Sequence, residues 1–189
     1  MPDERRAHER REAFTEAEVG KLLAKAKPVD AVLVLLGARG GLRLAEALAL
    51  RWAHVDLDAA NPIVRVIAGK GGRDRDVEMP GDLLGVLLAW RDERQSAPTD
   101  RVLPYTSATR ARQRLARLHE RAKLPRVRGR MAHSLRHTYG TAVYEAAGDL
   151  TVAQDLLGHA NPQTTRGYMH RANRQRLWAA VTLMPAFAV

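Results

Sequence analysis

The fold of this chain has to form around one segment, PVDAVLVLLGAR, at residues 28–39. Pro28 suits the first turn of a helix, and the Gly40–Gly41 pair breaks the helix after Arg39. A helix that is apolar on nearly every side is stable only when other elements cover it. We therefore predict that residues 28–39 form the central helix of the molecule.

Other helices are expected on both sides of this segment. Thr15 and Glu18 form a T-x-x-E capping box that opens a helix through about Ala26. LRLAEALAL, at 42–50, follows the glycine pair as a third helix. Beyond Pro80 the apolar spacing predicts helices at about 80–95, 107–122, 133–147, 151–157, 162–169 and 173–183.

Between these helical regions lie three short runs of β type, at 51–58, 62–69 and 73–80. Turn residues separate them, and the last two flank a KGG sequence that is typical of a hairpin. The expected fold class is mainly α, with a small antiparallel three-stranded β-sheet at the edge of a helical body.

Length and composition favour one globular domain. The chain has 189 residues, of which 46% are hydrophobic and 28% are charged.

No apolar run is long enough for a membrane span and no signal peptide is apparent, so we expect a cytoplasmic protein without a membrane partner. The absence of cysteine excludes disulfides and thiolate nucleophiles. A formal net charge of +10 predicts a polyanionic partner.

The positive charge is densest between residues 110 and 130, where nine basic residues accompany one acidic residue, Glu120. A charged helix face is often only a solvated one, but repulsion within so dense a cluster indicates a nucleic acid that neutralises it. The predicted helix carries four arginines on one face, with apolar residues on the opposite one. The candidate DNA-binding residues are Arg110, Arg114, Arg117, Arg121, Arg126 and Arg128.

Two chemistries other than metal-free phosphate binding fit the sequence less well. His133 and His137 have the i, i+4 spacing of zinc hydrolases, but Ser134 stands where the glutamate base would be, and Arg136 would repel a divalent cation. GKGGR lacks the phosphate-binding G-x-x-x-x-G-K-[ST] pattern, and its glycines belong to a hairpin turn.

A phosphate site without metal is the third interpretation. His133 and Arg136 project from one face of a predicted helix. Arg43 follows the glycine pair at the start of another helix, and Glu46 lies one turn on, where it can hold the guanidinium. Taken singly, a His-x-x-Arg pair is more often incidental, and the pair of Arg43 and Glu46 is equally compatible with a local surface salt bridge.

The order of these residues resembles that of the tyrosine recombinase (phage integrase) family, from about Phe14 to His170. Four segments carry the resemblance. They are GLRLAEALALRWAHVDLD, VIAGKGGRDRDVEMP, AHSLRHTYGTAVYEAAGDL and LLGHANPQTTRGYMH.

The resemblance implies an active site of six residues supported by Glu46. Arg43 and Arg136 match the phosphate-binding arginines, and Tyr168 matches the nucleophile. His133 and His159 match the two site histidines, and Lys70 matches the hairpin lysine that serves as general acid. His137 matches a residue expected to be structural. Ala45 and Ala160 depart from the serines that family members often carry there.

The implied function is site-specific cleavage and rejoining of DNA through a 3′-phosphotyrosine, with no metal or cofactor. Double-stranded DNA is the expected partner. The protein is expected to form a homotetramer on DNA, and a monomer is compatible with the DNA-free state. It is also expected to associate with the nucleoid. Relaxation of DNA in the manner of a type IB topoisomerase is one alternative, and a DNA-binding regulator without strand exchange of its own is another.

The resemblance also predicts the domain organisation. Residues 1–12 are expected to be a basic linker stub, and residues 13–189 the catalytic domain, without the N-terminal core-binding domain typical of the family. The apolar C-terminal segment around Trp178 is expected to pack either on its own domain or on a neighbouring subunit.

Overall fold

The computed structural model describes residues 13–67, 74–125, 131–147 and 181. Within these ranges the chain is mainly helical with one small sheet, which confirms the predicted fold class. The elements are α2 (Glu16–Leu23), α3 (Pro28–Ala38), α4 (Leu44–Ala49), a 3₁₀ turn η1 (Trp52–His54), β1 (Val55–Asp56), β2 (Ile63–Val66), β3 (Arg75–Glu78), α5 (Gly81–Arg94), α6 (Ala108–Arg121) and α7 (Met131–Ala147).

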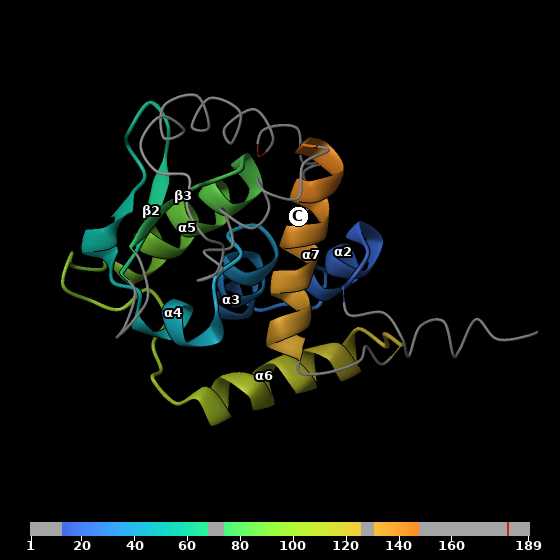
Figure 1. The fold of residues 1–189 in the computed structure, drawn as a ribbon. Coiled ribbons are helices and arrows are strands. Elements are labelled where there is room, and N and C mark those ends of the chain that lie inside the picture. The colour runs from blue at the N-terminus through green and yellow to red at the C-terminus, as the bar shows by residue number, and fades with distance from the viewer. Residues whose placement is uncertain (1–12, 68–73, 126–130, 148–180, 182–189) are drawn as a thin grey trace, which may run out of the picture.

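Helix α3 is the centre of the molecule, as its sequence predicts. Residues 32–36 are each at most 3% exposed. In Figure 1, α5 and the sheet lie on one side of α3, α7 and α2 lie on the other, and α6 runs beneath. The core therefore consists of the apolar faces of several helices that converge on α3.

Local sequence signals set the ends of the first helices. The Thr15 capping box is present: the backbone N–H of Glu18 donates to Thr15 Oγ1 at 3.3 Å, and that of Thr15 donates to Glu18 Oε2 at 2.8 Å. Helix α2 ends at Leu23, three residues before the predicted end. Helix α4 spans only six residues because Gly41 is left-handed, with φ of 61°, and Arg43 is extended.

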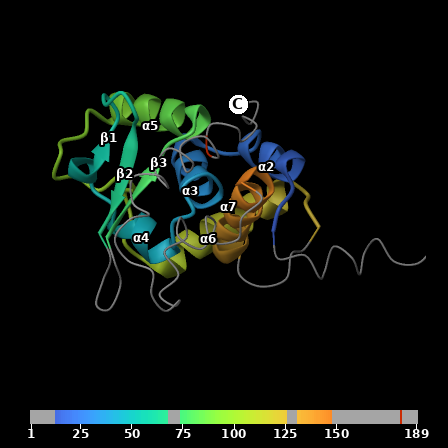
Figure 2. The ribbon, with the colours of Figure 1, turned by 45° about the horizontal axis from the view of Figure 1, so that its top comes forward.

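The sheet has the order β1-β2-β3 with antiparallel pairing, in which Val55 pairs with Val64 and Val64 with Val77. Strand β1 has only two residues because the preceding 52–54 form η1. Val64 and Val77 are fully buried, so one face of the sheet joins the core. In Figure 2, α5 lies beside the sheet.

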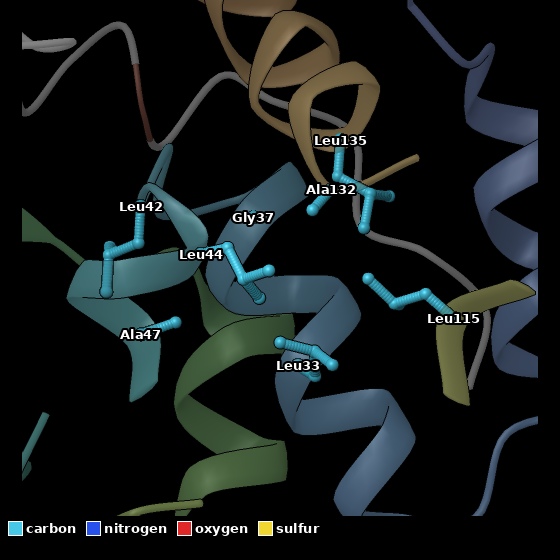
Figure 3. A pocket seen from close by; sticks show the side chains of 8 residues that line it. All are labelled: Leu33, Gly37, Leu42, Leu44, Ala47, Leu115, Ala132 and Leu135. Atoms are coloured by element: carbon cyan, nitrogen blue, oxygen red, sulfur yellow. The ribbon is translucent and has the colours of Figure 1, made fainter. Parts of the chain in front are cut away.

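Helix α7 lies close against α3 because Gly37 leaves room for it. A Cβ at Gly37 would come within 2.9 Å of Leu135 Cβ. A nearby gap among α3, α4, α6 and α7 measures about 10 Å³ and has an apolar lining, seen in Figure 3. A space of one water without polar partners is a packing gap and not a ligand site.

Several predicted features fall beyond the described ranges. The helices expected at 151–157 and 162–169 lie outside them, and of the helix expected at 173–183 only Val181 is described, as helical and buried. The expected linker at 1–12 is also outside. Among the described residues, no helix combines the length and hydropathy required to cross a membrane.

Candidate active site

The candidate site begins at the turn that joins α3 to α4. Gly41 adopts the left-handed conformation there, and a Cβ at this position would lie 2.4 Å from Cδ1 of Tyr139. Only glycine therefore suits the turn, both for its backbone conformation and for the close approach of an aromatic ring. The turn places Arg43 directly before α4, and the side chain of Arg43 is 47% exposed.

Glu46 lies one turn into α4 and holds Arg43, as the sequence predicts. Arg43 Nη1 donates to Glu46 Oε1 at 2.8 Å, and the backbone N–H of Arg43 donates to Glu46 Oε2 at 2.8 Å. The carboxylate therefore fixes both the backbone and the guanidinium of the arginine.

Helix α7 brings Arg136 to the same carboxylate. The side chain of Arg136 is 5% exposed, and its Nη1 donates to the carbonyl of Gly41 at 2.6 Å and lies 3.8 Å from Glu46 Oε2. Residues 93 positions apart in the chain, Arg43 and Arg136, thus face one acidic group.

A third arginine belongs to this cluster and was missed by the sequence reasoning. Arg75, the first residue of β3, donates from Nη1 to Glu46 Oε1 at 3.1 Å and from Nη2 to Glu46 Oε2 at 2.8 Å. Its signal in the sequence is the alternation of the strand, because Arg75 shares the inward face of β3 with the fully buried Val77. An arginine on the inward face of a strand requires a partner.

Burial and the neighbouring charges shift the pKa values of Glu46 and Arg136. Burial alone would raise the pKa of Glu46, but hydrogen bonds from Arg75 and Arg43 outweigh it and lower the pKa to about 2. Burial lowers the pKa of Arg136 to about 10, aided by the positive charges of Arg43 and Arg75 and opposed by Glu46. At neutral pH Glu46 is therefore ionised and Arg136 is protonated.

His133 lies one turn before Arg136 on α7 and is exposed. Its Nε2 lies 3.0 Å from Nε2 of His137, and the two rings meet edge to face. Since one imidazole nitrogen has to donate and the other to accept, at least one ring of the pair is neutral. His133 remains accessible to a ligand.

Tyr139 forms the floor of the site behind Gly41. The side chain is fully buried, and its hydroxyl has no hydrogen-bond partner in the described part of the chain. Burial and the negative charge of Glu78 raise the pKa of this phenol well above its usual value. Tyr139 is therefore a neutral packing residue and not an accessible nucleophile.

The arginine face of α6 differs from its prediction. At 100° per residue, the arginine and apolar faces adjoin each other and are not opposite. Arg114 Nη2 and Arg121 Nη2 lie 2.7 and 3.5 Å from the carboxylate of Asp30, a residue of α3 that is 3% exposed. Arg110 and Arg117 are exposed. The DNA-binding role of all four remains a prediction.

Five predicted functional residues lie outside the described ranges. They are Lys70, Arg126, Arg128, His159 and Tyr168. Of the predicted active-site residues and their support, the described part of the chain contains Arg43, Glu46, His133 and Arg136, and it brings the two arginines and Glu46 together. It also contains the four predicted DNA-binding arginines of α6. Among the described residues, no three His, Asp or Glu side chains form a group that could hold a metal ion.

Comparison with known proteins gives a consistent result. The sequence model of the phage integrase family matches residues 12–175. A tyrosine recombinase XerC of Xanthomonas campestris is 36% identical over 146 residues, which cover 75% of this chain and 44% of the relative. XerC of Corynebacterium glutamicum is 34% identical over 154 residues, which cover 79% of this chain and 49% of the relative. The chain spans about half the length of these curated relatives.

Solved structures share the fold. The integrase from mycobacterium phage Brujita superimposes with a TM-score of 0.72 and 24% identity, covering 94% of this chain and 59% of that one. The XerH site-specific recombinase bound to its difH substrate gives a TM-score of 0.66 and 22% identity, covering 90% of this chain and 50% of that one.

Proposed function

The chain belongs to the phage integrase family, and we propose that it acts on double-stranded DNA as the catalytic domain of a site-specific recombinase. Residues 13–189 are proposed to form this domain. The observation that carries the proposal is the convergence of Arg43 and Arg136 on one carboxylate, which leaves two guanidinium groups next to each other. Paired arginines are suited to the non-bridging oxygens of a phosphodiester.

The proposed reaction is a pair of transesterifications. The phenol oxygen of Tyr168 attacks the scissile phosphorus, the bond from phosphorus to the 5′ oxygen breaks, and a 3′-phosphotyrosine forms. His133 takes the phenolic proton, and Lys70 gives a proton to the departing 5′ oxygen. A second DNA 5′-hydroxyl then reverses the attack and releases the tyrosine, so no net hydrolysis occurs.

The arginine pair supplies electrostatic stabilisation in this scheme. The phosphorus passes through a pentacoordinate state with more negative charge than the starting diester. Arg43 and Arg136 therefore bind the transition state more strongly than the substrate, and His159 adds a further hydrogen bond. Because fixed cations fill this role, the scheme requires neither a divalent metal nor ATP.

The assembly and location follow from this activity. Strand exchange joins two DNA duplexes with four cleavable strands, so we propose a homotetramer on DNA, and a protein that resides in the cytoplasm in association with the nucleoid. The solved neighbours include a dimer of lambda integrase bound to a COC′ core site. Arg110, Arg117 and Arg121, which are exposed on α6, are proposed to contact the DNA backbone, together with Arg126 and Arg128.

A suicide-substrate experiment tests the proposal. A library of nicked duplexes with random sequence is incubated with the protein in EDTA, and covalent adducts are isolated after denaturation. The wild type should form adducts whose DNA reveals the preferred site. Tyr168→Phe should abolish them, and Arg43→Ala or Arg136→Ala should slow their formation about 10²-fold or more. Tyr144→Phe, on an exposed tyrosine of α7, is the matched control and should behave as the wild type.

Three outcomes would reject the proposal. Adducts that persist in the Tyr168→Phe protein would assign the nucleophile elsewhere, and a wild type that binds DNA without forming adducts would indicate a regulator. Relaxation of supercoiled plasmid without sequence preference would indicate a topoisomerase instead.

A further inference from the structure

The structure places a third guanidinium behind the arginine pair, and we propose that Arg75 is a positioning residue for that pair. Arg75 binds Glu46 through both of its terminal nitrogens, and it thereby fixes the direction of the carboxylate and offsets its negative charge. Arg43 and Arg136 can then bind the scissile phosphate with less competition from Glu46. The inference rests on the proposed function and deepens it.

The contact between Arg75 and Glu46 has the geometry of a strong ion pair. Each terminal nitrogen of Arg75 meets a different oxygen of Glu46, at 3.1 and 2.8 Å, and both side chains are 11% exposed. Within the described residues, the buried Nε of Arg75 has no hydrogen-bond partner. Glu46 is therefore the group that holds this guanidinium. A planar fork matched to a carboxylate restricts both partners in a way that a lysine cannot.

The supporting elements also indicate that Arg75 is the fixed member of the cluster. It belongs to β3 and pairs with Val66 in the sheet, so its backbone is held by the strand ladder. Arg43, by contrast, precedes a helix of only six residues, and its side chain is 47% exposed. The carboxylate of Glu46 thus connects a rigid strand to a more exposed arginine.

Charge balance gives the second half of the argument. Arg43, Arg75 and Arg136 with Glu46 carry a net charge of +2. The scissile diester carries a charge of −1, and its pentacoordinate state carries more. Without Arg75 the same site would carry +1, and Glu46 would compete with the phosphate for Arg43, 2.8 Å away, and for Arg136, 3.8 Å away. By neutralising Glu46, Arg75 therefore weakens the competition between this carboxylate and the phosphate.

A double-mutant cycle on cleavage tests this role. Single-turnover cleavage at saturating DNA is measured for Arg75→Gln, Glu46→Gln and the double variant. We expect Arg75→Gln to slow cleavage about 10-fold or more, and the double variant to cleave several-fold faster than Arg75→Gln, because removal of the acid removes the competitor. A folded double variant that cleaves no faster than Arg75→Gln would overturn the proposal, as would wild-type cleavage by Arg75→Gln.

A second measurement needs neither DNA nor activity. Carboxyl-carbon NMR follows the titration of Glu46, whose pKa of about 2 should rise toward its usual value of 4.5 in Arg75→Gln. Arg65→Gln is the matched control, since Arg65 lies on the outer face of the same hairpin and pairs with Asp76. An unchanged Glu46 pKa in folded Arg75→Gln would overturn the inference even if the wild type cleaves DNA.

Two further observations keep the outcomes separate. A wild type without adducts contradicts the proposed function, while the Glu46 titration still decides whether Arg75 controls the carboxylate. If Arg75→Gln does not fold, Arg75→Lys keeps the charge without the fork. Arg75→Lys should cleave DNA more slowly than the wild type and faster than the double variant. If it cleaves at the wild-type rate and the pKa of Glu46 is unchanged, the result contradicts positioning by the guanidinium fork.

Discussion

At the scale of single residues, Gly41 links the backbone to the arginine cluster. Its positive φ turns the chain from α3 into α4, its missing side chain admits the ring of Tyr139, and its carbonyl accepts the hydrogen bond from Arg136. A change at Gly41 therefore acts on the packing and on the site together.

Gly41→Ala should destabilise the protein by more than about 2 kcal/mol. Left-handed backbone costs roughly 1–2 kcal/mol for a residue with a Cβ, and displacement of the buried Tyr139 ring adds to this cost. The measurement is urea unfolding, and Gly85→Ala is the control. Gly85 is an exposed glycine of α5 with open space around it, so alanine should stabilise there by about 0.5–1 kcal/mol. Equal effects of the two changes would contradict this role of Gly41.

At the scale of elements, a buried ion pair connects three helices. Arg39, at the end of α3, is 1% exposed, and its Nε donates to Asp82 in the first turn of α5 at 2.8 Å. Its Nη2 donates to Glu16, the first residue of α2, at 3.0 Å. Arg39 therefore holds the ends of two helices against the central one.

Asp82→Asn should cost about 1–3 kcal/mol of unfolding free energy, because it removes the buried carboxylate of Arg39 and leaves Glu16, whose side chain is 39% exposed, as its remaining acidic partner. Chemical denaturation followed by far-UV circular dichroism measures the loss. Asp92→Asn serves as the control, since Asp92 pairs with Arg91 on the surface of the same helix, and exposed pairs contribute at most about 1 kcal/mol. A loss below 1 kcal/mol for Asp82→Asn would show that the pair does not hold the helices together.

At the scale of the whole molecule, the net charge of +10 is expected to govern the proposed association with DNA. Each phosphate that the protein neutralises releases counterions, which steepens the dependence of affinity on salt. The charge is not uniformly available, because the partly buried Arg114 is bound to Asp30 whereas Arg110 and Arg117 are exposed.

We expect DNA affinity to fall about 10³-fold between 50 and 200 mM salt if roughly six phosphates are contacted. Fluorescence anisotropy with a labelled duplex measures the slope of log K against log salt. Arg117→Gln should reduce the slope by about 1, whereas the matched variant Arg114→Gln should mainly reduce stability, because that side chain is bound to Asp30. If Arg117→Gln leaves the slope unchanged, Arg117 does not contact a DNA phosphate, and the proposed role of α6 in DNA binding is contradicted.

The sequence by itself determined the central helix, the Thr15 capping box, the three-stranded sheet and the pairing of Arg43 with Glu46. These features depend on apolar periodicity, capping and turn chemistry, which act between residues close in the chain. The order of residues also predicts the six-residue motif of the family, in which the roles of Lys70, His159 and Tyr168 stay predictions.

Only the tertiary structure decided how distant residues share charge. Arg75 meets Glu46 across 29 positions, Arg136 meets the Gly41 carbonyl across 95, and Arg114 meets Asp30 across 84. No local pattern specifies such pairs, because they depend on how β3, α6 and α7 pack against α3 and α4. A buried charge has to be neutralised by whichever partner the packing brings near, and that partner is fixed only when the core has formed.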